Sequence, residues 1–369
     1  MTAAQDELRQ AVRGFLAATS DSAAVRSLID SDTGYDATAW HRMASELGLH
    51  GIAVPERFGG AGAGNAELAV VFEEMGAALL CAPFFATVAL AIPAILGSAD
   101  DDAIAEFVPP LADGSATATL VLNGRLGPWD ESAIAVTARG DDRVGYTVYG
   151  DAPMVLDGHT ADVVLVAADC EAGTSLFAVD GRAEGLFRRP LAGLDRTRRI
   201  GHLHFDGAPA RPVGRPGAAG PGLALVADVA TMLLAAEQLG GAARCLDTAV
   251  GYAKDRIQFG RPIGSFQAVK HRCADMLVLV EGARSAVAHA AALTDPDELA
   301  VAASVAKLTA SETFTQVALD NMRVHGGLGF TWEHDAHLYV RRAKSSSLMF
   351  GDPDHHALRL GELVTTTPA

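Results

Sequence analysis

The hydrophobic period of this chain changes twice along its length, and this change limits the possible folds more than any other feature. Up to about residue 112, apolar residues recur with helical spacing, as at Leu68, Val71 and Met75. Residues 113–208 instead contain short runs rich in β-branched and aromatic residues, separated by Asn-Gly and Asp-Gly turns. The helical spacing then returns. The sequence therefore predicts helices, then a small β domain, then a long helical bundle.

The middle region predicts an antiparallel sheet or barrel, because its strands are short, evenly spaced and not interleaved with helices. The expected strands are residues 119–122, 133–137, 146–149, 163–166, 175–179 and 202–205. A Pro- and Gly-rich linker follows at residues 211–221. We expect an α+β protein with an N-terminal helical domain (1–112), a middle antiparallel β domain (113–210) and a C-terminal four-helix bundle (219–365).

One helix of the last region carries a predicted packing seam. Its apolar residues alternate steps of three and four, which is the spacing of a helix that packs along another helix. The seam residues are Phe266, Val269, Cys273, Met276 and Val280.

Charge and hydropathy exclude several classes of protein. The chain has 29 basic and 45 acidic residues, a net charge of −16, which argues against nucleic acid and anionic membrane surfaces as partners. The most apolar stretch, residues 223–236, contains Asp228 and is too short to span a bilayer. We expect it to be a buried core helix.

The cysteines indicate a reducing compartment. Cys81, Cys170, Cys245 and Cys273 form no CxxC pair and have no metal-ligand spacing. The N-terminal residues lack a basic segment and an apolar segment, so no signal peptide is expected. Both features favour a cytoplasmic protein.

The histidines do not predict a metal site. His334 and His337 are three residues apart, and an adjacent His pair at 355–356 lies close to two aspartates, but neither spacing matches a known ligand geometry. No GxSxG nucleophile motif is present either.

Three glycine-containing loops are candidate sites. Residues 59–64 do not match GxGxxG, so a surface turn is favoured over a phosphate loop. Residues 256–267 break a helix at Gly260 and Pro262, giving either an anion or pyrophosphate cradle or an ordinary turn with surface arginines. Residues 323–330 give either a close backbone approach to a ligand or a helix C-cap. His325 alone is more typical of a structural hydrogen bond than of a base.

Several segments resemble one family. Residues 252–276 and 324–335 resemble the two C-terminal signatures of the acyl-CoA dehydrogenases, while residues 54–62 and 194–206 resemble the N-terminal loop and the end of the β domain. The resemblance covers nearly the whole chain. It implies FAD as cofactor, an acyl-CoA thioester as substrate, α,β-dehydrogenation with a carboxylate base, and an electron-transfer flavoprotein as electron acceptor.

The resemblance also implies which residues reach the FAD of a neighbouring subunit. They are Arg256, Phe259, Gln267, Arg323, Val324, His325, Gly326 and Gly327. Arg323 stands where the family usually has Gln, and a cation there can still pair with a pyrophosphate.

Other parts of the family pattern are missing. The segment that holds the flavin ring is replaced at residues 122–133 and 153–158. The usual position of the base falls at Phe350, and the alternative position at Ala230. Neither residue can accept a proton. The nearest carboxylates are the candidate bases Asp352 and Asp354, and also Asp228, for which capping or surface roles are the alternative.

This asymmetry resembles the actinobacterial-type, non-catalytic subunit of a heteromeric acyl-CoA dehydrogenase, in which a related chain supplies the base and the flavin pocket. Such heterotetramers are associated with bulky substrates such as steroid side-chain thioesters. Two alternatives remain: a self-sufficient homo-oligomeric dehydrogenase that uses Asp352 or Asp354 as a displaced base, and an inactive scaffold that binds acyl-CoA.

Overall fold

The computed structural model describes residues 2–123, 125–141 and 143–366. The chain forms two compact units. The helical unit comprises Met1–Arg26, Asn65–Leu80 and Thr231–Ala369, and the β unit comprises Ser27–Gly64 and Cys81–Ala230. The helix–strand–helix order agrees with the expected fold class, which is confirmed.

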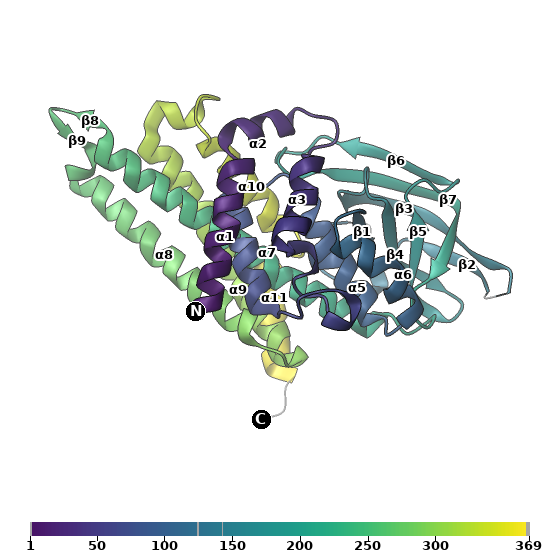
Figure 1. Ribbon diagram of the computed structural model, residues 1–369. Helices are drawn as coiled ribbons and strands as arrows, with labels where there is room; N and C mark the ends of the chain where they lie inside the picture. Colours follow the sequence, from purple (N-terminus) through teal and green to yellow (C-terminus); the bar gives the residue numbers. More distant parts are fainter. Residues whose placement is uncertain (1, 124, 142, 367–369) are drawn as a thin grey trace. The chain divides into compact units, whose positions relative to one another are not determined.

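The elements are named in chain order in Figure 1. The α-helices are α1 (Ala3–Thr19), α2 (Ser22–Ile29), α3 (Ala37–Leu47), α4 (Asn65–Ala77), α5 (Ile92–Gly97), α6 (Asp101–Ala112), α7 (Gly220–Asp255), α8 (Gln267–Ala292), α9 (Pro296–His325), α10 (Ala336–Leu348) and α11 (Pro353–Thr366). The strands are β1 (Ala118–Val121), β2 (Thr137–Asp141), β3 (Gly145–Leu156), β4 (Val163–Cys170), β5 (Gly173–Asp180), β6 (Leu186–Leu191), β7 (Ile200–Pro212), β8 (Ile257–Gln258) and β9 (Arg261–Pro262).

The β unit is built on a seven-stranded sheet with the order β1-β4-β2-β3-β7-β5, in which β6 pairs with β7 and β4 also pairs with β5. Most pairs are antiparallel, as predicted, but β1 and β4 are parallel, with Ala118 opposite Val163. The purely antiparallel expectation was wrong here because β2 and β3 intervene in the chain between β1 and β4. A crossover of that length can return a strand in the same direction.

Five of the six expected strand segments lie in strands. Residues 133–137 do not: Glu131–Ala133 forms a 3-10 turn capped by the Asp130 carboxylate, and β2 begins only at Thr137. The sequence pattern did not predict β6, whose Arg188, Arg189 and Pro190 break the apolar alternation. Among the described residues β6 pairs only with β7, and such edge strands tolerate charges and Pro.

A buried threonine fastens the helices of the β unit to its sheet. The π-helical segment η3 (Phe85–Ala91) carries Thr87, which is fully buried. Its hydroxyl donates to the Ala118 carbonyl and accepts from the Ala118 N–H, both at 3.1 Å. The polar group of Thr87 is thereby satisfied inside the core, and η3 is held against β1.

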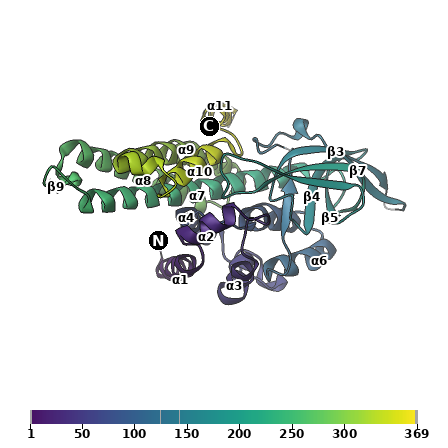
Figure 2. The same cartoon turned by 90° about the horizontal axis from the view of Figure 1, so that it is seen from above.

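In the helical unit, α8 and α9 run alongside α7 and α10 (Figures 1 and 2), and α1, α4 and α11 belong to the same unit. By length and composition α7 could cross a membrane, but 78% of its most apolar window is buried, as in a core helix. The expected seam on α8 begins later than predicted, because Phe266, Val269 and Cys273 near its exposed N-terminal end are only partly buried. The buried stripe is Met276, Val280, Ala283, Val287 and Ala290.

Helices α4 and α7 cross with almost no side chain between them. A Cβ atom at Gly76 would lie 1.9 Å from the Glu237 carbonyl oxygen, and one at Gly240 would lie 1.7 Å from the Glu73 carbonyl oxygen. Any side chain at either position would force the helices apart. The two glycines therefore set the distance between α4 and α7.

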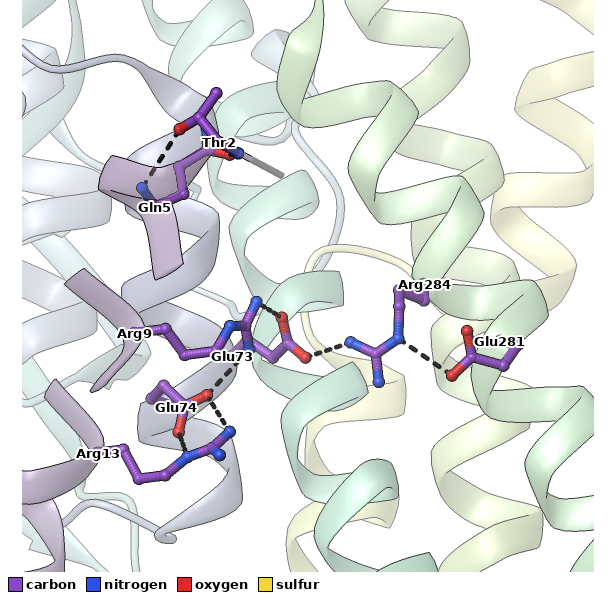
Figure 3. A network of polar contacts seen from close by, with 8 residues as sticks. All are labelled: Thr2, Gln5, Arg9, Arg13, Glu73, Glu74, Glu281 and Arg284. Carbon is purple, nitrogen blue, oxygen red and sulfur yellow. Dashed lines mark hydrogen bonds and ion pairs between the residues drawn. The ribbon is translucent and has the colours of Figure 1, made fainter. Parts of the chain in front are cut away.

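A cluster of ion pairs joins α1, α4 and α8 close to this crossing (Figure 3). Arg9 binds Glu73 at 2.8 Å and Glu74 at 2.9 Å, and Arg13 binds Glu74 at 2.8 Å. Arg284 of α8 reaches Glu73 at 2.6 Å. Burial would raise the pKa of Glu73, but its hydrogen bonds to Arg9 and Arg284 outweigh burial and lower it. The Glu73 carboxylate is therefore held ionised.

Candidate functional site

The predicted loop at residues 256–267 contains a small hairpin. Helix α7 ends at Asp255, and Ile257 pairs with Pro262 in the β8–β9 ribbon. Phe259 (φ +54°) and Gly260 (φ +75°) lie at its tip, and positive φ at both central residues is what the tight hairpin turns require. The Phe259 side chain is 91% exposed. The hairpin thus presents a large aromatic ring to solvent from a backbone conformation that is unfavourable for Phe.

Cationic groups accompany this ring. The Arg256 side chain is exposed and has no carboxylate within 4 Å in the part of the chain that the structure describes. The Arg261 guanidinium lies over the Phe266 ring, 4.1 Å from its centroid, and Phe266 meets Phe259 edge-on at 6.0 Å. Exposed arginines beside aromatic rings suit a ligand that has both an aromatic base and phosphates.

The predicted loop at residues 323–330 lies at the end of α9. Gly326 ends the helix with φ +60° and ψ −138°, and its N–H donates to the Arg323 carbonyl. A Cβ atom at Gly326 or Gly327 would meet nothing within 4 Å, so the backbone is open to an approaching ligand. The chain then forms the 3-10 segment η6 (Gly326–Phe330). The loop is both a helix end and an open backbone surface, so the two interpretations of the sequence are compatible.

The structure brings the two loops together. Tyr252, one turn before the end of α7, stacks on His325 at the end of α9, with ring centroids 4.3 Å apart. His325 is buried, and its Nδ1 donates to the Asn321 carbonyl at 2.8 Å. Burial lowers the pKa of His325. The side chains of His325 and Val324 are thus both buried, so the predicted site groups that this loop exposes are the Arg323 side chain and the glycine backbone.

Arg323 is positioned by a carboxylate that the sequence pattern did not indicate. Asp320, one turn earlier on α9, binds Arg323 at 2.9 Å and also binds Arg272 of α8. Burial acts to raise the pKa of Asp320, but the hydrogen bonds from Gln316, Arg323 and Arg272 lower it. The i, i+3 spacing of Asp320 and Arg323 was a detectable signal. The partner on α8 was not, because it depends on the packing of the bundle.

The position of the usual base has become part of the core. The Phe350 side chain is 4% exposed, and its backbone has φ +57°. The Phe350 carbonyl accepts from His356 Nε2 at 3.1 Å. Lys307, fully buried, donates to the carbonyls of Ser347 (3.2 Å) and Gly351 (3.1 Å) and to the Ser311 hydroxyl (3.0 Å). Residues 349–351 are therefore clamped with an apolar side chain directed inward.

The carboxylates close in sequence have other roles. Asp352 is exposed and accepts from the His355 N–H at 2.8 Å at the start of α11. Asp354 is exposed in the first turn of that helix. Asp228 lies buried on α7, and Ala230, the alternative base position, is fully buried. These placements are those of capping, surface and core residues.

The remaining predictions concern metal ligands, the cysteines and the two segments that replace the flavin-ring motif. Among residues 2–123, 125–141 and 143–366, no three His, Cys, Asp or Glu side chains are grouped to hold a metal ion. All four cysteines are free. Asn123 donates to the Pro128 carbonyl at 2.8 Å in the segment that replaces the flavin-ring motif; residue 124 of that segment lies outside the described residues. Met154, in the second replaced segment, is 41% exposed.

The helical unit also contains a cavity of about 410 Å³ between α1, α4, α7 and α10, lined by Leu16, Leu338, Tyr339, Arg13 and Arg244 among others. None of the predicted site residues lines it. The candidate site is instead the exposed end of the bundle, where the hairpin and the α9 terminus meet.

Comparison with known proteins decides the family. Sequence models of the acyl-CoA dehydrogenase N-terminal and C-terminal domains match residues 2–115 and 227–364. The chain is 37% identical over 361 residues to acyl-CoA dehydrogenase IpdE2 of Mycobacterium tuberculosis (strain ATCC 25618 / H37Rv), covering 98% of this chain and 97% of the relative. The chain belongs to the acyl-CoA dehydrogenase family.

Solved structures of the family superpose on it closely. A Tcur3481–Tcur3483 steroid ACAD variant has a TM-score of 0.86 at 33% identity and covers 98% of this chain and 97% of that one. The ChsE4–ChsE5 complex from Mycobacterium tuberculosis has a TM-score of 0.90 at 29% identity, with coverage of 100% and 99%. Acyl-CoA dehydrogenases are oxidoreductases that typically bind FAD.

The residues at the end of the bundle fit such a cofactor. A dinucleotide carries a pyrophosphate and an aromatic base. Arg256 offers an exposed guanidinium, Gly326 and Gly327 offer an open backbone, and Phe259 offers a ring face. Gln267, at the start of α8, is exposed next to the hairpin.

Proposed function

We propose that this chain is the non-catalytic subunit of a heteromeric acyl-CoA dehydrogenase and that it contributes contacts to the FAD of a related partner chain. One contrast carries the proposal: the end of the bundle offers the exposed Arg256 and Phe259 and an open backbone at Gly326, whereas the position of the usual base holds the buried Phe350. Ala230, at the alternative position, cannot accept a proton either. The names of both similar structures pair two chains, which supports a partner of the same family.

In this proposal, the residues of this chain bind and orient. When bound, FAD supplies the acceptor for the hydride that leaves the β-carbon of the acyl thioester. Arg256 and Arg323 would neutralise the pyrophosphate charge, and Phe259 would contact the nucleotide. The partner supplies the carboxylate that removes the α-proton. The electrons then pass to an electron-transfer flavoprotein.

We further propose a heterotetramer, a bulky acyl-CoA substrate such as a steroid side-chain thioester, and a cytoplasmic location. The substrate class is supported by the similarity to a protein whose name describes a steroid dehydrogenase. The four free cysteines favour a reducing compartment.

Purification with and without a partner tests the proposal. The chain alone should carry no stoichiometric flavin and should not turn over acyl-CoA. Co-expression with a related dehydrogenase chain that has an acidic base should give a yellow complex that oxidises steroid-derived acyl-CoA faster than straight-chain acyl-CoA. A lone chain with bound flavin and turnover that Asp352→Asn or Asp354→Asn abolishes would establish the self-sufficient enzyme instead.

An arginine pair sharpens this test. Arg256→Ala should reduce the flavin content of the complex at least tenfold, because a charge-assisted contact to pyrophosphate contributes about 1.5–3 kcal/mol. Arg182→Ala removes an equally exposed arginine of the β unit and should leave the flavin content unchanged. Equal flavin content in the two variants would contradict the proposed role of the hairpin.

A further inference from the structure

The loop that follows the open glycines is held by histidine contacts. His334 Nδ1 accepts a hydrogen bond from the Ala336 N–H, at 3.1 Å, and Ala336 is the first residue of α10. Asp335, which directly precedes the helix, makes no side-chain cap. An acceptor at Nδ1 requires that this nitrogen carries no proton. A neutral imidazole therefore caps the N-terminus of α10.

Other charged and titratable groups surround this imidazole. From α9, the His325 ring lies 4.1 Å from the His334 ring. From α2, Arg26 binds the Asp335 carboxylate at 2.6 Å and the Trp332 carbonyl at 2.5 Å. These contacts hold both flanks of residue 334.

The helix that His334 caps adds two more groups. His337, on the first turn of α10, packs edge-on against Trp332 at 4.4 Å, and Arg341 lies over the same ring at 5.5 Å. The cations around His334 are Arg26 and Arg341; of the carboxylates, Asp335 follows His334 directly in the chain and the exposed Glu333 precedes it.

We propose that His334 is an acid-sensitive latch: the neutral ring caps α10 and holds residues 326–335 closed, and protonation releases both. A proton on Nδ1 removes the acceptor of the cap. It also places positive charge at a helix N-terminus, where the helix dipole is unfavourable to cations, and next to the tilted ring of His325.

The direction of the titration agrees with this geometry. Burial and then the neighbouring His325 lower the pKa of His334; Arg26 acts in the same direction and Asp335 in the opposite one. In the released loop the pKa returns to its ordinary value of about 6.5. The closed state is therefore fully favoured above pH 6.5. Below that value it weakens about tenfold per pH unit until the lowered pKa is reached.

Hydrogen exchange of the full-length chain at pH 7.5 and pH 5.0, corrected for the intrinsic exchange rate, tests the latch. In the wild type, protection of amides in residues 326–340 should fall about tenfold or more at pH 5.0. The variant His334→Asn should stay protected at both pH values, because an Asn side chain can accept from the same N–H two residues on and does not titrate. His334→Leu should be poorly protected at both.

A matched histidine variant controls for general acid effects. His271→Asn changes an exposed histidine of α8 and should respond to acid like the wild type. Equal wild-type protection at both pH values would overturn the latch. So would an acid response of His334→Asn as large as that of the wild type, since it would assign the titration to His325 or His337. The result does not depend on the proposed function, because no flavin or partner takes part.

Discussion

Two phenylalanines of the helical unit adopt the same unfavourable backbone conformation with opposite outcomes. Phe259 (φ +54°) is 91% exposed, and Phe350 (φ +57°) is 4% exposed. Such a conformation costs a non-glycine residue about 1–3 kcal/mol and persists only where the surroundings impose it. At Phe259 a hairpin imposes it and leaves the ring available. At Phe350 buried hydrogen bonds impose it and the ring becomes core. The same backbone strain thus leaves one aromatic ring exposed at the end of the bundle and buries the other at the position proposed for the usual base.

The largest expected effect is on the clamp of the buried turn. Lys307→Ala should lower the free energy of unfolding by about 4–6 kcal/mol, because three charge-assisted hydrogen bonds are lost and their acceptors stay buried. Urea denaturation of Lys307→Ala and of Lys344→Ala, an exposed lysine on α10, measures it. The control should change by less than about 0.5 kcal/mol. Similar losses in both variants would mean that the clamp does not stabilise the turn.

The phenylalanine pair itself gives the next effect. Phe350→Ala should cost about 3–5 kcal/mol of unfolding free energy by opening a cavity. Phe259→Ala, at the same φ but exposed, should change it by less than about 0.5 kcal/mol. Denaturation of both variants under one condition compares them directly. If the two variants lose equally little unfolding free energy, Phe350 does not stabilise the core, and the contrast between the two phenylalanines fails.

Two glycines at the end of α9 test whether the backbone conformation there is also imposed by its surroundings. Gly326→Ala should lower the free energy of unfolding by about 1–3 kcal/mol. The reason is that φ +60° with ψ −138° is a region that only glycine adopts readily. Gly327→Ala meets no atoms either, but its φ is not positive, so it should be neutral or slightly stabilising. Thermal unfolding of the two variants separates backbone strain from steric effects. Equal losses of stability in the two variants would exclude a conformational role for Gly326.

The smallest expected effect is the loss of folding stability at low pH that His356 causes. Burial first, and then Lys307, lower the pKa of His356 to about 3. Its ordinary value is about 6.5, so the folded state loses stability as the pH falls from 6.5 towards 3, by about 1.4 kcal/mol per pH unit for this group. His356→Gln keeps a donor for the Phe350 carbonyl but does not titrate. Denaturation midpoints at pH 7 and pH 5.5 should show a smaller loss for the variant than for the wild type; an equal loss would assign the titration to other groups.

The local parts of the fold followed from the sequence. Helical spacing, Asp-Gly turns and the Pro–Gly linker predicted the order of helices and strands, and five of the six expected strands. β6 was missed because an edge strand does not need the apolar alternation on which strand prediction depends. The parallel β1–β4 pair was missed because strand direction depends on the path of the chain between the two strands.

The site was predictable only in its outline. The motifs located Arg256, Phe259 and the glycines, because glycine and arginine in that spacing have few structural roles. The Tyr252–His325 stack that joins the loops was not predictable, since it depends on how α7 packs on α9. Lys307 also gave no signal, because a lysine in a helix ordinarily lies at the surface.

The crossing at Gly76 and Gly240 has a consequence for how this sequence can vary. Because the two backbones touch there, the carboxylates of Glu73 and Glu237 sit at fixed heights on their helices, within reach of Arg284 and Arg342 respectively. A methyl group at either glycine would push the two backbones apart and so change the N–O distances of these ion pairs. The two glycines therefore set the geometry of the buried charges as well as the distance between the helices.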